Sequence, residues 1–195
     1  IEITTQMLAT LFDFPWEERH KLPFWSDVVT SNPGMGNNSL DEMERRKILM
    51  ECLSAFQGLW EARKDGPPAM DFISLMAQHP DTKDFADDPF TLLGNLMLLI
   101  VGGNDTTRNS ISGGVLALNR HPEQYDRLTA DPSLIPNMVS EIIRWQTPLA
   151  YMRRTALEDV ELDGHTIREG DKVIMWYVSG NRDEAKFAEA DDFDI

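Results

Sequence analysis

The chain has 195 residues, of which 33 are acidic and 18 are basic, so its formal net charge at pH 7 is −15. This acidity, without a cluster of lysine and arginine, argues against binding to nucleic acid or to an anionic membrane surface. The hydrophobic fraction of 42% suits a packed core, and the longest apolar stretch, residues 92–101, is shorter than the roughly 20 residues that a membrane-spanning helix needs.

Helices are predicted over most of the first three-quarters of the chain, because apolar residues recur there at the spacing that one face of an α-helix requires. Pro23 is expected to bend the second helix. Ser39 stands three residues before Glu42, which is the spacing of a capping box, and is expected to open the third. In chain order, the predicted helices cover residues 3–12, 16–30, 39–63, 71–78, 89–120, 122–130 and 136–145.

The fifth predicted helix is the longest. Asp88 followed by Pro89 combines a capping side chain with a proline in the first turn. The next helix breaker is His121, which also precedes a proline. A single helix of about thirty residues, roughly 45 Å long, is therefore predicted between these two points.

The pattern changes towards the end of the chain, where short β segments are predicted. The sequence VELDGHTI, residues 160–167, indicates two strands joined at Asp163 and Gly164, a pair typical of a tight hairpin turn. The sequence KVIMWYVS, residues 172–179, is rich in β-branched and aromatic residues and predicts a further strand. The predicted fold class is mainly α with a small β-sheet.

The sequence LLIVGGNDTTRNS, residues 98–110, lies in the middle of the long helix. Each glycine inside a helix costs about 1 kcal/mol relative to alanine, so Gly102 and Gly103 need another reason. A notch without side chains lets a flat, rigid body approach the backbone, while Asp105 supplies a proton donor and Thr106 a hydroxyl beside it. The residues alone equally allow close helix packing at the glycines, with both polar side chains merely solvated.

Three further charged residues follow this segment. Glu141 and Arg144 are three apart on one helix face, where an ordinary surface pair is the simplest interpretation. Arg154, near the start of the predicted sheet, can hold an anionic group through two hydrogen bonds or be a surface arginine. The histidines lack metal-ligand spacing, so no metal site is predicted and all four are expected in surface or loop positions: His20, His79, His121 and His165.

The order and spacing of these motifs resemble the cytochrome P-450 superfamily of haem-thiolate monooxygenases. The resemblance rests on Gly-Gly-Asn-Asp-Thr in a long helix, Glu-x-x-Arg about 35 residues later, Arg-x-Ala-x-Glu-Asp and an Asp-Gly hairpin. The phrases LPFWSDV, GGNDTTRNS, EIIRWQTPLAYMRRTA and GDKVIMWYVSGNRD are similar to the bacterial soluble subfamily that hydroxylates the terminal carbon of medium-chain alkanes. The resemblance implies that residues 1–195 are an internal segment of a single cytochrome P-450 domain with a partial version of its fold.

The resemblance also implies roles for the residues in the long helix. Gly102 and Gly103 would form the groove for dioxygen beside the haem, Asp105 would be the acid of the proton relay, and Thr106 the hydroxyl that supports oxygen activation. Glu141 and Arg144, joined by Arg182, would be a structural network that holds the core behind the haem, and Arg154 would pair with a haem propionate. The implied substrate pocket is lined by Leu98, Val101, Gly102, Ala150 and Met152. The implied substrate lid consists of Phe24, Trp25 and the loop around Met35.

The expected cofactor is haem b, supplied indirectly with electrons from NADH by a ferredoxin reductase and a ferredoxin. The other expected partners are dioxygen and a small hydrophobic substrate, bound by a monomer in the cytoplasm without nucleic acid or a membrane span. The resemblance points to medium-chain n-alkanes, although the residues equally allow a fatty acid or a terpene. The alternative from another class is a helical ligand-binding domain without catalysis.

One departure from the family concerns the thiolate that ligates its haem iron. The expected cysteine would lie beyond Ile195, and the single cysteine present, Cys52, is expected to be a small buried hydrophobe in the segment ILMECLSAF. A single cysteine also excludes an internal disulfide and is typical of a reducing cytoplasm. The chain alone is therefore expected to bind haem weakly and to leave several apolar faces without partners.

Overall fold

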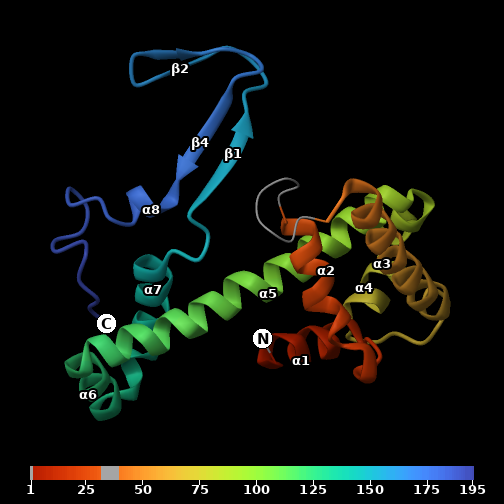
Figure 1. Cartoon of the computed structure of the whole chain (residues 1–195), viewed down its shortest axis with the longest axis horizontal. Helices are drawn as coiled ribbons and strands as arrows, with labels where there is room; N and C mark the ends of the chain where they lie inside the picture. Colours follow the sequence, from red (N-terminus) through yellow and green to blue (C-terminus); the bar gives the residue numbers. More distant parts are fainter. Residues whose placement is uncertain (1, 32–39) are drawn as a thin grey trace. The chain divides into compact units, whose positions relative to one another are not determined.

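The computed structural model describes residues 2–31 and 40–195, which divide at Arg108 into two compact units. The fold is mainly α-helical with short antiparallel strand pairs near its end, which confirms the predicted fold class. The longest helix, α5 (Pro89–Arg120), contributes to both units and is the long green ribbon in Figure 1. Among the described residues, no helix combines the length and the apolar character that crossing a membrane requires.

The first unit is entirely helical in its regular structure. Besides the first part of α5, it contains α1 (Glu2–Phe12), the 3₁₀ turn η1 (Trp16–Glu18), α2 (Lys21–Thr30), α3 (Glu42–Arg63), α4 (Phe72–Gln78) and η2 (Lys83–Asp87). The second unit adds the strands. Besides the rest of α5, it contains α6 (Pro122–Ala130), η3 (Pro132–Leu134), α7 (Ile135–Gln146), β1 (Tyr151–Thr155), β2 (Val160–Leu162), β3 (His165–Ile167), β4 (Lys172–Trp176) and α8 (Tyr177–Gly180).

Aspartates cap several of these helices. Asp41 accepts a hydrogen bond from the amide of Glu44 at 2.7 Å, so it opens α3, whereas the predicted cap Ser39 lies outside the described residues. Asp88 accepts hydrogen bonds from two amides in the first turn of α5, as its position before Pro89 predicts. Each aspartate satisfies backbone donors that have no partner within the helix.

The prediction of one bent helix over residues 16–30 is wrong. The segment forms the short turn η1, and α2 then begins at Lys21, which places Pro23 in the first turn of α2. A proline is tolerated there because the first amides of a helix have no intrahelical acceptor to lose. Pro23 therefore marks the start of a helix and bends none.

The core of the first unit gathers aromatic side chains from several helices. Phe12, Trp25 and Phe56 are fully buried, and the rings of Phe12 and Phe56 meet edge to face at a centroid distance of 5.3 Å. Cys52 is also fully buried in this core, which confirms the expectation from its sequence context. Burial raises the pKa of its thiol to about 12, so the thiolate form is disfavoured.

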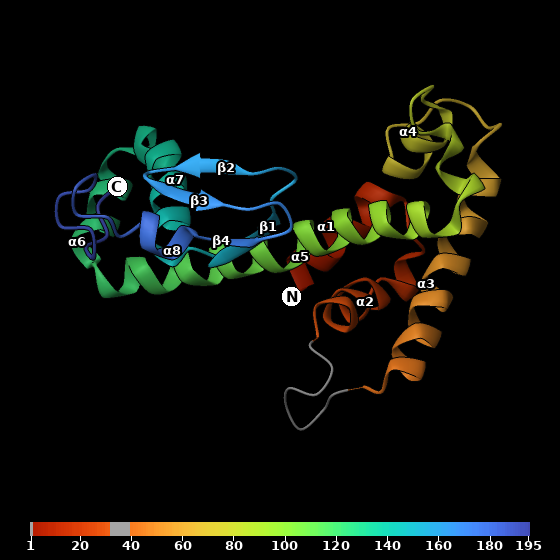
Figure 2. The ribbon, with the colours of Figure 1, turned by 90° about the horizontal axis from the view of Figure 1, so that it is seen from above.

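The strands form two separate two-stranded sheets, β1 with β4 and β2 with β3, where a single small sheet was predicted. The predicted hairpin is confirmed: Asp163 and Gly164 both have positive φ, 50° and 77°, as the tight turn between β2 and β3 requires (Figure 2). The strand predicted to reach residue 179 ends at Trp176, which pairs with the first residue of β1. Beyond that point the backbone closes the helical turn α8 instead.

The core of the second unit is smaller and depends on close approach of α5 to α7. A Cβ atom added at Gly113 would lie 2.5 Å from the side chain of Gln146, and one added at Gly114 would lie 2.6 Å from that of Ile142. Both glycines therefore serve helix packing. Nearby, Ala117, Phe193 and Ile195 form a buried cluster with partly buried side chains of α6 and α7.

Candidate functional site

The segment 98–110 is continuous α-helix, and its two adjacent glycines have different surroundings. A Cβ atom at Gly103 would lie 2.8 Å from Cδ2 of Leu8 on α1, so this glycine permits helix packing. A Cβ atom at Gly102 would have no atom within 4 Å apart from its chain neighbours and the backbone of its own helix. The packing interpretation therefore describes Gly103, while Gly102 faces open space. One turn later, the Thr106 hydroxyl donates to the Gly102 carbonyl at 2.8 Å.

The two glycines predict opposite effects of alanine on stability. Gly102→Ala is expected to raise the free energy of unfolding of the apoprotein by about 1 kcal/mol, because it gains helix propensity without a clash. Gly103→Ala gains the same propensity but must displace Leu8, which is only 2% exposed, so a net loss is expected. Urea unfolding of both variants checks this pair, and equal losses would show that Gly102 is a packing residue too.

An open face of α5 surrounds Gly102. Leu98, one turn earlier, is 72% exposed, and Val101 is half-buried. On the opposite side, Leu96 and Ile100 are fully buried in the core of the first unit. The helix thus presents an exposed apolar side chain and a bare backbone on one face, an arrangement suited to contact with a flat apolar group.

The Asp105 carboxylate lies beside this face and is held by two donors. Arg108 Nη2 donates to Asp105 Oδ1 at 2.5 Å, and Asn104 Nδ2 reaches the same oxygen at 3.5 Å. The Asn104 side chain is fully buried, and its Oδ1 accepts a hydrogen bond from the Thr4 hydroxyl at 3.1 Å. These partners were not predicted from the sequence. The three-residue spacing of Asp105 and Arg108 was a usable signal, whereas no local pattern marks Thr4.

In the second unit, Arg154 lies on β1 and is exposed. Residues two apart on a strand share a face, so Arg154 and Met152 lie on the same side of the β1–β4 pair, where Arg154 Nη1 is 4.0 Å from the Met152 sulfur. Ala150 directly precedes the strand, and its carbonyl accepts from the Val178 amide at 3.2 Å. The structure thus brings together Arg154 and Met152 within this unit, and Leu98 to Thr106 within α5.

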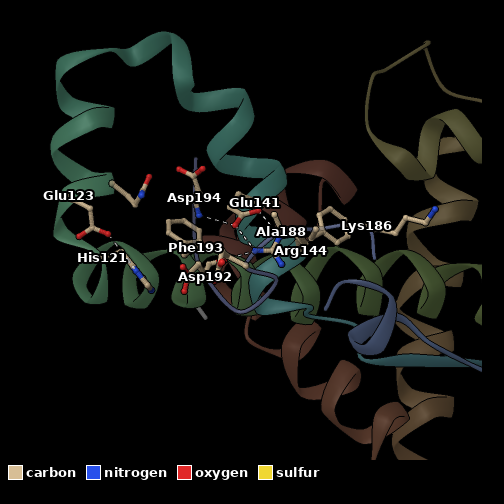
Figure 3. Close-up of a pocket in the computed structure, with 12 residues that line it drawn as sticks. His121, Glu123, Glu141, Arg144, Lys186, Ala188, Asp192, Phe193 and Asp194 are labelled. Atoms are coloured by element: carbon tan, nitrogen blue, oxygen red, sulfur yellow. Dashed lines mark hydrogen bonds and ion pairs between the residues drawn. The ribbon is translucent and has the colours of Figure 1, made fainter. Parts of the chain in front are cut away.

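Glu141 and Arg144 on α7 form a two-pronged ion pair, with both hydrogen bonds at 2.7 Å (Figure 3). Their side chains are only 13% and 12% exposed. The Glu141 carboxylate raises the pKa of Arg144 by accepting these hydrogen bonds. Arg144 also donates to three backbone carbonyls of the segment after α8, those of Asn181, Ala190 and Asp192.

Other contacts fasten the same C-terminal segment. The Asp194 amide donates to Glu141 at 3.0 Å, and Arg182 donates to the carbonyls of Trp145 at 2.7 Å and Ala190 at 3.0 Å. Arg182 therefore lies in the network of Glu141 and Arg144. An ordinary surface pair would have no such partners, so that interpretation does not describe this pair. Its position favours a structural task, the fixing of residues 181–194 against α7.

Two cavities of the second unit can be compared with the predicted substrate pocket. One, of about 670 Å³, borders Glu141 and Arg144 and has further carboxylates in its wall, so it is polar (Figure 3). The other, of about 350 Å³, lies between α5 and α7 and is lined mainly by aliphatic side chains. Neither cavity is lined by the predicted substrate residues. Within the described residues, no group of histidine, cysteine, aspartate and glutamate could hold a metal ion.

The residues predicted for a substrate lid are only partly available for that task. Trp25 is fully buried, with its ring against those of Phe14 and Phe56, so it is a core residue. Phe24, its neighbour on α2, is 48% exposed. Met35 lies outside the described residues.

The chain is similar to known proteins. The family model described as Cytochrome P450 matches residues 4–195. A methyl-branched lipid omega-hydroxylase of Mycobacterium tuberculosis is 55% identical over 193 residues, which cover 97% of this chain and 44% of that protein. Linalool 8-monooxygenase of Pseudomonas putida is 43% identical over 152 residues, which cover 76% of this chain and 36% of that protein. The chain thus spans less than half the length of these relatives.

Solved structures with a similar fold include CYP153D17 from Sphingomonas sp. PAMC 26605, with a TM-score of 0.87 and 53% identity over 99% of this chain and 48% of that one. Cytochrome P450-153 from Novosphingobium aromaticivorans matches with a TM-score of 0.84 and 48% identity over 100% of this chain and 46% of that one.

Proposed function

The chain belongs to the cytochrome P450 family, and we propose that it is an internal segment of one haem-dependent monooxygenase domain. The whole enzyme would insert one oxygen atom of O₂ into the terminal C–H bond of a medium-chain n-alkane. The observation that carries the proposal is the open face of α5 at Gly102, next to the acid Asp105 and the hydroxyl of Thr106. Such a face is what a reaction at a flat, apolar cofactor needs.

The residues of this face fit haem b. When bound, haem supplies the iron at which dioxygen is activated. Leu98 and the bare backbone of Gly102 would contact its apolar face. The resemblance to the family implies that Arg154 pairs with a propionate. Asp105 would deliver protons, and Thr106 would offer its hydroxyl as a hydrogen-bonding partner at the reacting centre.

Cys52 does not fit as the axial ligand of this haem. Its side chain is fully buried in the core of the first unit, and burial favours the protonated form of the thiol. The thiolate would therefore come from a segment outside these 195 residues. Carbon monoxide added to the reduced full-length protein should give the red-shifted Soret band of thiolate ligation, and Cys52→Ala should leave that band unchanged.

The resemblance to the family implies an apolar substrate pocket lined by Leu98, Val101, Gly102, Ala150 and Met152. Such a wall binds a hydrocarbon through buried area, at about 25 cal/mol per Å², without hydrogen bonds. The resemblance of segments such as GGNDTTRNS to the subfamily that hydroxylates medium-chain alkanes supports an alkane substrate. The similarity to an omega-hydroxylase of methyl-branched lipids favours a second candidate, a lipid chain oxidised at its end.

Binding spectra of the full-length protein separate these substrates. We expect octane to produce the largest shift of the haem spin state, because a pocket lined by aliphatic side chains leaves a carboxylate or hydroxyl without a partner. A fatty acid and linalool serve as comparisons. A larger shift with the fatty acid would replace the alkane by the lipid, and the absence of a shift with all three would contradict an aliphatic substrate.

The electron supply is also a proposal. We expect electrons from NADH to arrive through a ferredoxin reductase and a ferredoxin, and the enzyme to act as a cytoplasmic monomer. Reconstitution of alkane oxidation with purified components tests this supply, since omission of ferredoxin should abolish the product.

A further inference from the structure

We propose that Arg108 and Asn104 are positioning residues that hold the Asp105 carboxylate beside the open face of α5, and that Thr4 of α1 fixes Asn104 in the orientation this requires. The inference rests on the proposed function, because it specifies how the acid of that same site is oriented. All four side chains lie in the first unit.

Arg108 provides the charged side of this arrangement. Its Nη2 atom is 2.5 Å from Asp105 Oδ1, and the two side chains are 26% and 24% exposed. A charge-assisted hydrogen bond in such a partly buried place is stronger than one between neutral groups. Without the guanidinium, the carboxylate would turn towards water, because an unpaired charge near an apolar face is poorly solvated. Arg108 thereby determines the direction in which Asp105 points.

Asn104 is the second donor to the Asp105 carboxylate, and its own orientation is fixed. Its amide is fully buried, and its oxygen accepts the hydrogen bond from Thr4, so its nitrogen is directed at Asp105 Oδ1. A buried amide with satisfied hydrogen bonds resists rotation, because any other orientation leaves a donor or acceptor unpaired. The orientation of the carboxylate is thus tied to α1, which lies about a hundred residues earlier in the sequence.

The two donors converge on one carboxylate oxygen, which has a chemical consequence. In the part of the chain that the structure describes, the hydrogen bonds from Arg108 and Asn104 to the carboxylate both reach Oδ1. Oδ2 is then the oxygen available for proton transfer. The proton would pass from Oδ2 to the reacting centre and be replaced by one from water, so the carboxylate returns to its initial state after each turnover.

The test compares Arg108→Ala and Arg108→Lys in the full-length holoenzyme. Arg108→Ala is expected to lower the product formed per NADH on the order of ten-fold, less than the ~10²–10⁴ that a complete acid–base group contributes. The affinity for octane, measured from the spin-state shift, should stay unchanged, and the solvent isotope effect on product formation should rise. Arg108→Lys should restore part of the coupling, that is, of the product formed per NADH, because it keeps a cation one turn from Asp105.

Arg45→Ala is the matched control. Arg45 also pairs with a carboxylate three residues earlier and donates to backbone carbonyls, but it lies on α3. Its loss should lower stability without changing the product formed per NADH. The proposal is overturned if Arg108→Ala keeps normal coupling, or if its coupling and its octane affinity fall together, as general damage to the fold would cause.

A double-mutant cycle of Asp105→Asn and Arg108→Ala, followed by urea unfolding, separates this proposal from the proposed function because it needs no turnover. The two substitutions should be non-additive in the unfolding midpoint. Additive effects would overturn the positioning role even in an active alkane hydroxylase. If the effects are non-additive but the protein oxidises no aliphatic substrate, the proposed function is contradicted, whereas the contact between Asp105 and Arg108 is confirmed.

Discussion

Arg144→Ala is expected to lower the free energy of unfolding by about 3 kcal/mol, the lower end of the loss typical when one partner of a buried ion pair is removed, because this pair is largely but not fully buried. The substitution deletes both hydrogen bonds to Glu141 and those to the three carbonyls of the C-terminal segment. Glu141 would keep only the Asp194 amide among its described partners and would be left a poorly compensated charge, 13% exposed. Urea unfolding of the full-length protein measures the loss.

Two controls show whether the loss of stability comes from the largely buried network or from the ion pair alone. Lys64 pairs with Glu61 at the same three-residue spacing and the same distance of 2.7 Å, but both side chains are largely exposed, so Lys64→Ala should leave the unfolding midpoint nearly unchanged. Arg144→Lys keeps the charge but has too few donors for five acceptors, so it should still be clearly destabilising. Equal, small effects of Arg144→Ala and Lys64→Ala would contradict the structural task of the pair.

The helices could be predicted because their signals are local. Asp88 with Pro89, and the breaker at His121, set the limits of α5, which the structure places at Pro89 and Arg120. The turn at Asp163 and Gly164 is equally local, since both residues need positive φ. In each case the physical cause lies within a few residues of the element that it determines.

Features that depend on distant partners were missed or misjudged. Nothing near Trp25 indicates that its ring packs against Phe56 in the core, so its assignment to a lid was wrong. The end of β4 is set by its partner, because β1 offers no residue opposite Tyr177. Register and strand ends are properties of pairs, and a single strand sequence does not contain them.

In the candidate site, too, local features could be predicted from the sequence and features that depend on distant residues could not. Gly102 and Gly103 carry identical sequence signals, yet Leu8 from α1 approaches only Gly103. The Glu-x-x-Arg spacing predicts an ion pair, whereas its energetic weight comes from carbonyls more than thirty residues later. Residue type and spacing identify candidate chemistry, and burial by distant segments decides how much each candidate contributes.

Thr106→Ala is expected to uncouple the full-length enzyme. NADH consumption should continue, while the product formed per NADH falls on the order of ten-fold or more and hydrogen peroxide accumulates. The physical reason is local: the Thr106 hydroxyl lies one turn beyond Gly102, where it donates to the Gly102 carbonyl, and alanine removes this polar group beside the open face. Parallel assays of NADH, hydroxylated octane and peroxide give the ratio directly.

Two companion variants decide whether the fall in product formed per NADH comes from the missing hydroxyl or from a change in helix geometry. Thr10 on α1 makes the same type of bond, donating to the carbonyl four residues earlier at 2.9 Å, so Thr10→Ala has a similar effect on helix geometry away from the site and should leave coupling normal. Thr106→Ser keeps the hydroxyl and loses only the methyl group, so it should retain most of the coupling. If Thr106→Ser uncouples as strongly as Thr106→Ala, the methyl contact is the important one, and the hydroxyl loses its assigned role.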